Sequence, residues 1–145
     1  MLLGVTTLVG GRPTNVANVH LSPSAEAGLD RQLATVARYL DVRRARPTIV
    51  GGDFNALPDN VGMARFYTPR AGGTGRFVEL DEAGAGAPAR SGEATFDVGG
   101  RKIDYVFVSA AHFGSPRAAS AESPLSDHRV FRGTARLTGV ATPPR

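Results

Sequence analysis

One amphipathic helix between β-rich segments constrains the fold of this chain more than any other feature. Within residues 25–44, apolar side chains recur at spacings of four, three and four, the repeat of a single helical stripe. The stripe consists of Leu29, Leu33, Val36 and Leu40. Pro47 ends the helix, and Thr48-Ile49-Val50 begins a short buried strand directly after it. The sequence therefore predicts a layered domain in which this helix packs against a sheet.

The rest of the chain is rich in strand signals. Residues 3–9 and 14–20 flank the turn residues Gly10-Gly11-Arg12-Pro13, so we expect an antiparallel hairpin. The hydroxyls of Ser22 and Ser24 are expected to cap the helix. We also expect a helical turn near 60–67, a brief strand or helix at 77–80, a second hairpin of 94–98 with 101–108, and a final strand at 128–138. The predicted fold class is α/β or α+β.

Composition excludes several classes of protein. The 145 residues suit one domain, and no apolar run approaches the roughly 18 residues of a membrane-spanning helix. The opening residues 1–11 have no basic stretch before their apolar part, so we expect a strand there rather than a signal peptide. The absence of cysteine excludes disulfides, thiolate metal sites and thiol nucleophiles.

The positive charge of the chain is carried almost entirely by arginine. The net charge is +4, and the sequence contains 16 arginines against the single lysine Lys102. This balance favours a polyanionic partner such as nucleic acid or a phosphorylated lipid surface. A genome whose base composition enriches Arg, Ala and Gly together explains it equally well.

Polar side chains follow the buried strand near residue 50. Asp53 and Asn55 stand two residues apart, so an extended chain places both on one face. Gly51 and Gly52 before them let a ligand approach the backbone closely. Taken alone, an Asp-x-Asn sequence at this place is more often a turn cap than a site.

Two further strand ends carry acids and imidazoles. Asp104 stands inside an apolar strand, and because an unpaired buried carboxylate is costly it needs a partner, either a structural cation such as Lys102 or a His or metal. Asp127 and His128 are adjacent before the last strand, and His20 ends the second one. Taken alone, Asp104 fits a structural ion pair and a site equally well, whereas the Asp127-His128 pair and His20 are more often structural. Together, carboxylates and imidazoles without cysteine suit a hard cation such as Mg²⁺ and attack of water on phosphate.

The order of these motifs resembles a known superfamily. The motifs are His20-Leu21, the helix containing Gln32, Gly52-Asp53-Phe54-Asn55, Ile103-Asp104-Tyr105-Val106-Phe107 and Ser126-Asp127-His128. They resemble the endonuclease/exonuclease/phosphatase superfamily, which includes deoxyribonuclease I, abasic-site endonucleases, inositol polyphosphate phosphatases and bacterial sphingomyelinases. The resemblance implies a four-layer α/β sandwich, with two sheets face to face and helices outside. It assigns residues 1–138 to the C-terminal part of this domain and leaves 139–145 as a disordered tail.

The resemblance also implies a divalent-metal-dependent phosphoesterase that uses activated water. The implied catalytic residues are His20, Asp53, Asn55, Asp104 and His128. Asp53 and Asp127 would hold Mg²⁺, or Mn²⁺ or Ca²⁺, while Asn55, His128 and His20 would bind phosphate. Asp53 would orient or deprotonate the water, and His128, paired with Asp104, would act as general base or stabilise the phosphate. Nucleic acid is slightly favoured as substrate over a phosphorylated lipid or inositol.

One part of the superfamily pattern has no counterpart in this sequence. Members begin with a strand ending in Asn and continue to a Gln-Glu pair whose Glu is a principal metal ligand, and nothing before His20 corresponds to either. Such sandwich domains run to about 200–250 residues, so we expect an N-terminally truncated domain. Truncation would expose a sheet edge and permit self-association. The alternative function is a catalytically incomplete remnant or a phosphate-binding module that lacks this Glu.

Overall fold

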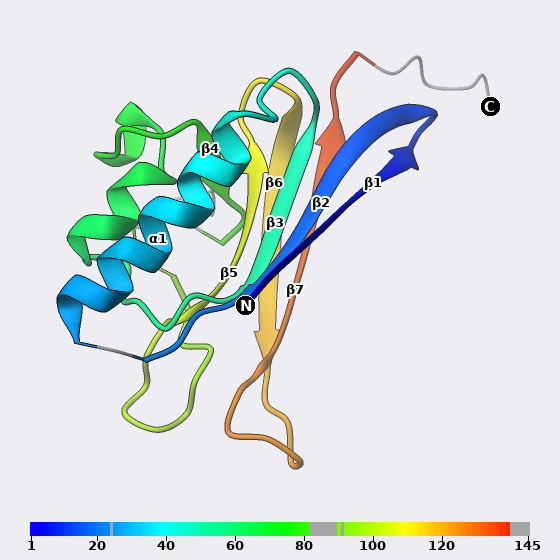
Figure 1. Ribbon diagram of the computed structural model, residues 1–145. Helices are drawn as coiled ribbons and strands as arrows, with labels where there is room; N and C mark the ends of the chain where they lie inside the picture. The colour runs from blue at the N-terminus through cyan, green and yellow to red at the C-terminus, as the bar shows by residue number, and fades with distance from the viewer. Residues whose placement is uncertain (24, 82–89, 91, 140–145) are drawn as a thin grey trace.

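A five-stranded mixed sheet forms the centre of the molecule (Figure 1). The computed structural model describes residues 1–23, 25–81, 90 and 92–139. The elements are β1 (Leu2–Val9), β2 (Arg12–His20), α1 (Glu26–Asp41), β3 (Thr48–Asp53), the 3₁₀ turns η1 (Val61–Arg65) and η2 (Pro69–Ala71), β4 (Phe77–Glu79), β5 (Asp104–Ser109), β6 (Phe113–Ala121) and β7 (Val130–Leu137). The strand order is β1-β2-β3-β5-β4, and β6 and β7 pair as a separate ribbon.

The pairing of β3 with both of its neighbours determines where polar side chains meet. β2 and β3 are parallel, and their register places His20 beside Asp53. β5 is antiparallel to β3, and its first residue, Asp104, is opposite Asp53. Three predicted site residues therefore come from adjacent strand ends at one end of the sheet.

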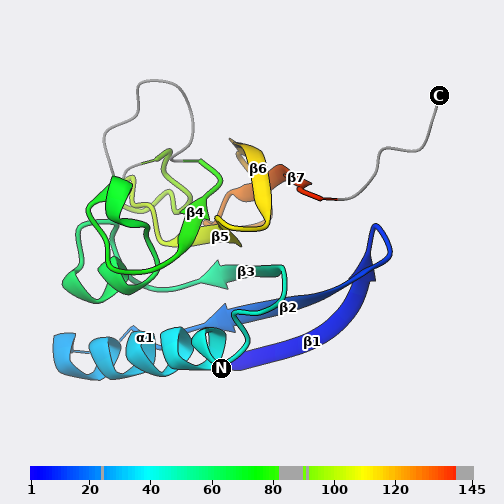
Figure 2. The same ribbon diagram turned by 90° about the horizontal axis from the view of Figure 1, so that it is seen from above.

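The two faces of the sheet are covered by different layers (Figure 2). On one face, α1 buries the predicted stripe, and Leu33 and Leu40 are almost completely inaccessible to solvent. On the other face, the β6–β7 ribbon packs Phe113 and Leu137 against Val108. The described residues thus form three layers, helix, sheet and ribbon, and the predicted α/β class is confirmed.

Local differences from the sequence predictions have simple physical reasons. The residue before the helix is Ala25, which makes no side-chain cap. The Ser22 backbone exchanges two hydrogen bonds with the Gln32 side chain, at 2.9 and 3.2 Å. Ser24, the other expected cap, lies outside the described residues. The turn between β1 and β2 contains only Gly10 and Gly11, because the backbone of residues 12 and 13 already belongs to β2.

The second predicted hairpin is reduced to one antiparallel bridge between Phe96 and Arg101, and one strand is missing from the predictions. Residues 94–98 form no strand; Phe96 makes single bridges to Arg101 and His128. β6 was not predicted because its sequence, with Gly, Pro, Ser and Ala, has little β propensity. Hydrogen bonding to β7 stabilises β6 as a strand in spite of that composition. The predicted disordered tail falls almost wholly on residues 140–145, which lie outside the described residues.

β1 lies at an edge of the sheet and exposes apolar side chains. Within the described residues no strand pairs with its outer side, and Leu3, Val5 and Leu8 are mostly exposed. An exposed edge of this kind was expected, and self-association through it stays a prediction. No helix in the described part of the chain combines the length and apolarity needed to cross a membrane.

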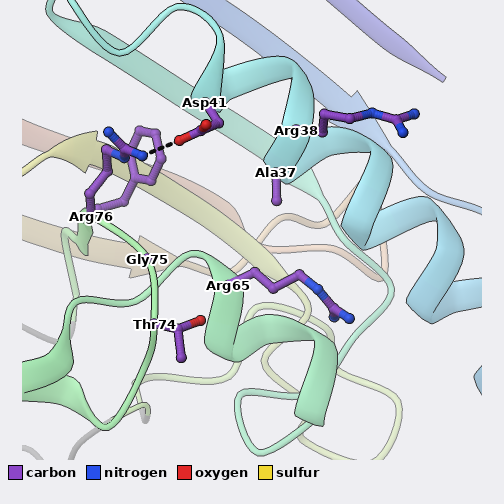
Figure 3. A pocket seen from close by; sticks show the side chains of 8 residues that line it. Ala37, Arg38, Asp41, Arg65, Thr74, Gly75 and Arg76 are labelled. Atoms are coloured by element: carbon purple, nitrogen blue, oxygen red, sulfur yellow. Dashed lines mark hydrogen bonds and ion pairs between the residues drawn. The ribbon is translucent and has the colours of Figure 1, made fainter.

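A crevice of about 290 Å³ separates α1 from the segment that joins η1 to β4 (Figure 3). Arg76 pairs with Asp41 across it, and Arg65 turns away to Asp30, with 2.6 Å between guanidinium and carboxylate. The third arginine, Arg38, also points away. Two of the three arginines form ion pairs with acids of α1. We therefore interpret the crevice as a packing contact between α1 and the η1–β4 segment rather than as a ligand site.

Lys102 is the most deeply buried cation among the described residues. Its Nζ lies 3.5 Å from Glu79 Oε1 and 3.3 Å from Asp81 Oδ2, and only 3% of its side chain is exposed. The ring of Phe131 covers the ammonium at 4.2 Å. Lys102 thus joins the β4 end to the start of β5, and its partners are these two acids rather than the carboxylate of Asp104.

We predict that Lys102→Met destabilises the protein by about 3–5 kcal/mol, because it leaves a buried carboxylate without its counter-charge. Urea denaturation followed by circular dichroism measures the change. The exposed Arg31 provides the control, and Arg31→Met should change stability by less than about 0.5 kcal/mol. Equal stabilities of the two variants would contradict the structural role of the buried ammonium.

Candidate active site

Asp53 lies at the end of β3, and the backbone before it allows no side chain at Gly52. Gly52 has φ +127°, and a Cβ there would come within 2.0 Å of the Val19 carbonyl oxygen on β2. The close approach of β2 and β3 at this point therefore depends on glycine. It holds the Asp53 backbone against Leu21, whose N–H donates to the Asp53 carbonyl at 2.9 Å.

Asn55 fixes the carboxylate of Asp53. Its backbone N–H donates to Asp53 Oδ1 at 2.7 Å, and its side-chain Nδ2 donates to Asp53 Oδ2 at 2.9 Å and to the Leu21 carbonyl at 2.7 Å. Asn55 adopts φ 48°, a left-handed conformation that asparagine tolerates better than most residues. Both amide hydrogens are thus engaged within the protein. In this arrangement Asn55 positions Asp53, and its contact with phosphate stays a prediction.

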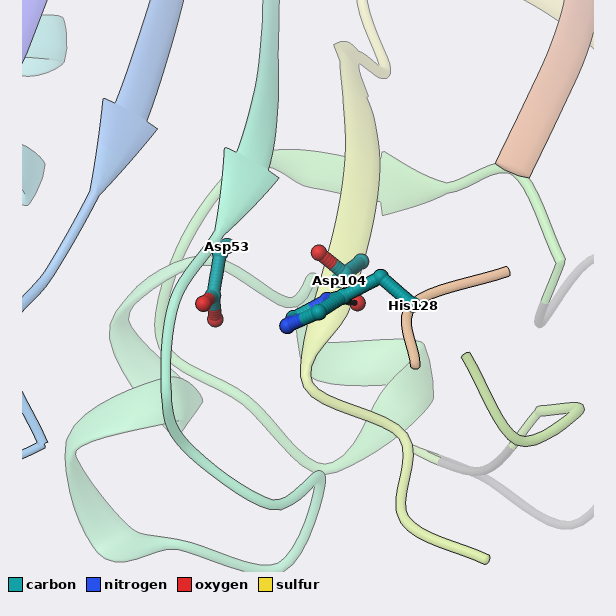
Figure 4. Close-up of side chains that lie close together, drawn as sticks. All are labelled: Asp53, Asp104 and His128. Carbon is teal, nitrogen blue, oxygen red and sulfur yellow. Dashed lines mark hydrogen bonds and ion pairs between the residues drawn. The ribbon is translucent and has the colours of Figure 1, made fainter. Parts of the chain in front are cut away.

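His128 and Asp104 form a hydrogen-bonded pair (Figure 4). His128 Nδ1 lies 3.0 Å from Asp104 Oδ2, which answers the need of Asp104 for a partner. With Nδ1 bonded to the carboxylate, the other ring nitrogen, Nε2, points toward Asp53. A carboxylate on Nδ1 selects the neutral tautomer whose Nε2 accepts a proton, which suits a general base.

The pKa values of both groups are displaced in the same direction. Burial raises the pKa of Asp53 above its usual value; the hydrogen bond from Asn55 opposes this shift, and the charge of Asp104 adds to it. For His128, burial favours the neutral ring, but the hydrogen bond and charge of Asp104 outweigh it and raise the pKa. The cluster therefore contains a carboxylate and an imidazole that both hold protons more readily than usual.

Asp53, Asp104 and His128 each place one donor atom within 4.8 Å of the others. Two neighbouring carboxylates attract a cation, and carboxylate oxygens suit Mg²⁺, Mn²⁺ or Ca²⁺. The donor set thus fits a divalent metal. Asp127 does not belong to this group, although its charge helps to raise the pKa of His128, so its role as a metal ligand stays a prediction.

His20 lies at the solvent side of the cluster. Its Nε2 is 3.7 Å from Asp53 Oδ2, and 65% of its side chain is exposed. An imidazole in this position can reach a bound anion from solvent. The structure therefore brings together four of the predicted side chains, His20, Asp53, Asp104 and His128, with Asn55 behind them.

Two supporting residues escaped the sequence predictions. Thr95 is fully buried, and its Oγ1 accepts the backbone N–H groups of Ile103 and Asp104 at 3.1 and 2.9 Å. Phe96 packs on the His128 ring, with 4.8 Å between centroids, and bridges its backbone. Both residues lie in the segment expected to be a strand, and that pattern gives no sign of their long-range contacts with Asp104 and His128.

These observations define an α/β protein with a carboxylate–imidazole site at the ends of adjacent strands. The sequence profile described as the Endonuclease/Exonuclease/phosphatase family matches residues 2–128, and the chain belongs to that family. No curated protein sequence matches the chain significantly.

Several solved structures share the fold of this chain. The human Nocturnin catalytic domain with bound sulfate anion is 21% identical, with a TM-score of 0.66 over 92% of this chain and 52% of its own. D. rerio TDP2, humanized by 14 mutations, is 19% identical, with a TM-score of 0.69 over 93% and 60%. A Bacteroides thetaiotaomicron mannosyl-6-phosphatase is 17% identical, with a TM-score of 0.61 over 88% and 52%. The chain spans between half and three-fifths of the length of these proteins.

We predict that Gly52→Ala destabilises the protein by about 3 kcal/mol or more, because a methyl group cannot fit against the Val19 carbonyl. Gly72 is the matched control, since it also has positive φ but no atom within 4 Å of the place where an alanine methyl group would lie. Gly72→Ala should cost only about 1–2 kcal/mol. Urea denaturation of both variants measures the difference, and equal costs would contradict the close approach of β2 and β3.

Proposed function

We propose that this site hydrolyses phosphoester bonds with the help of a divalent cation, and that phosphodiesters of nucleic acid are its favoured substrates. The observation that carries the proposal is the hydrogen-bonded Asp104–His128 pair facing Asp53 at the ends of β3 and β5. Family membership supports phosphoester chemistry in general. Among the similar structures, one holds a sulfate anion and another is a mannosyl-6-phosphatase.

The protein groups have separable roles in the proposed reaction. His128 Nε2 takes a proton from the attacking water, and Asp104 holds the ring in the required tautomer and stabilises the charged imidazolium. Asp53, fixed by Asn55, orients the water. His20 approaches a non-bridging oxygen of the phosphate from the solvent side.

Asp53 is the residue best placed to hold the cation, with Asp127 as the predicted second carboxylate. Asp104 already forms a hydrogen bond with His128, and a cation bound to the Asp104 carboxylate would weaken that hydrogen bond. When bound, a divalent cation supplies Lewis-acid stabilisation of the phosphate charge. Burial first, and then the charge of Asp104, raise the pKa of Asp53, and a bound cation would offset both effects by favouring the ionised carboxylate.

We predict that the chain hydrolyses bis-p-nitrophenyl phosphate when Mg²⁺ or Mn²⁺ is present. His128→Gln and Asp53→Asn should each lower the rate by a factor of about 10²–10⁴, since each removes a proton-transfer or water-orienting group. Asp97→Asn is the control, because Asp97 is an exposed partner of Arg129 and should leave the rate within about twofold.

Three outcomes separate the proposal from its alternative. Turnover lost in the two site variants and kept in the control supports hydrolysis. Phosphate binding without turnover supports the phosphate-binding module instead. Turnover that survives His128→Gln contradicts the assigned general base.

We further predict that millimolar Mg²⁺ or Mn²⁺ raises the unfolding temperature and that a chelator reverses the rise. At a hundredfold excess over the dissociation constant the gain is about 2.7 kcal/mol, or roughly 5–10 °C for a chain of this size. Differential scanning fluorimetry at constant ionic strength measures it. Asp53→Asn should abolish the rise in unfolding temperature and Asp97→Asn should retain it. The opposite pattern would show that Asp53 does not bind the cation.

A further inference from the structure

The outer face of the β6–β7 ribbon carries a row of arginines that the proposed reaction does not use. Side chains alternate along both strands except at a register shift between Gly114 and Arg117, and because of this shift Phe113 packs inward against the sheet together with Ala118 and Leu137. The outward residues include three exposed arginines and two hydroxyls: Arg117, Arg132, Arg136, Ser115 and Thr134. We call these five residues the arginine ribbon.

The charges of the arginine ribbon are not neutralised within the described part of the chain. No ion pair or hydrogen bond reaches its three guanidinium groups there, and neither strand contains an acidic residue. Arg65, Arg76 and Arg129 elsewhere on the surface each pair with a carboxylate. The arginine ribbon is therefore a concentrated positive surface that can bind an external anion.

The strand register places these cations close enough to act together. Arg117 is opposite Thr134, and Arg132 is two residues before Thr134 on β7, so the two arginines are diagonal neighbours on one face. A shallow hollow of about 300 Å³ lies over this part of the ribbon, lined by Arg117, Arg132 and Thr134 among others. Guanidinium forks beside a hydroxyl match the oxygens of a phosphate.

The arginine ribbon begins beside the candidate active site and leads away from it. Ala121 pairs with Val130 at the end of the ribbon next to His128, while Phe113 pairs with Leu137 at the far end. At about 3.4 Å per residue, Arg132 and Arg136 lie roughly 14 and 27 Å along the chain from His128. A nucleic-acid strand that advances about 3.4 Å per nucleotide covers these spans with about four and eight nucleotides.

We propose that the arginine ribbon binds the phosphate backbone of a nucleic-acid strand whose scissile phosphate occupies the candidate active site. A linear row of guanidinium groups favours a linear polyanion. A membrane is less suited, because the exposed apolar residues of this face are small ones such as Ala119, Ala121 and Val130, with no aromatic side chain to insert. The inference rests on the proposed function, because it assumes that the bound strand is the substrate. Binding of the strand is nevertheless measured without turnover, so the two can fail separately.

The test compares two triple variants that remove the same charge. Arg117→Gln/Arg132→Gln/Arg136→Gln removes the ribbon cations. The matched control, Arg31→Gln/Arg38→Gln/Arg46→Gln, removes three exposed arginines on and after α1. Fluorescence anisotropy with a labelled single strand of about 12 nucleotides, without divalent cation and across a salt series, measures binding. Circular dichroism confirms that both variants are folded.

We expect the ribbon variant to bind at least about tenfold more weakly at about 50 mM salt. Its salt dependence should lose about two units of slope, since three phosphate contacts disappear. The control should change by less than about threefold. Hydrolysis of bis-p-nitrophenyl phosphate, which is too small to reach the ribbon, should be the same in the ribbon variant and the wild-type chain.

The remaining outcomes are equally informative. Equal loss in both triples would show that net charge alone attracts the strand and would overturn the proposal. Binding of phosphatidylserine vesicles but not of the oligonucleotide, lost only in the ribbon variant, would overturn it in favour of a membrane. If no variant hydrolyses the small diester while ribbon-dependent strand binding persists, the proposed function fails and the binding surface stands.

Discussion

The site of this protein depends on the position of β3 between a parallel and an antiparallel neighbour. Parallel pairing with β2 places His20 beside Asp53, and antiparallel pairing with β5 places Asp104 opposite it. A shift of one residue in either register would move these side chains to opposite faces of the sheet. Gly52 protects the first pairing by allowing β3 to approach β2 closely. The chemistry of the site thus follows from backbone pairing before any side chain contributes.

Much of this arrangement could be predicted from the sequence, because its signals are local. The stripe of Leu29 to Leu40 repeats with helical spacing, and the β1–β2 hairpin surrounds a Gly-Gly turn. The need of Asp104 for a partner also followed from one residue in an apolar strand, and His128 meets that need. In each case the burial or the backbone conformation of a few neighbouring residues decides the structure.

The parts that could not be predicted depend on contacts between distant segments. β6 contains Gly114 and Pro116, which disfavour strands, and its partner β7 supplies the pairing. Thr95 and Phe96 lie in the segment expected to be a strand, yet they form a loop that holds the Asp104 backbone and the His128 ring. The sequence also pointed to Lys102 as a partner of Asp104, whereas the ammonium is neutralised by Glu79 and Asp81 in the interior.

The central claim is that the Asp104–His128 pair and Asp53 direct water onto phosphorus. Hydrolysis of a phosphodiester in water enriched in oxygen-18, followed by mass spectrometry of both products, tests this claim most directly. The account predicts one heavy oxygen on the phosphate product for each ester cleaved and none on the released alcohol. Heavy oxygen in the alcohol, or no ester cleavage by the folded chain in the presence of divalent cation, would contradict it.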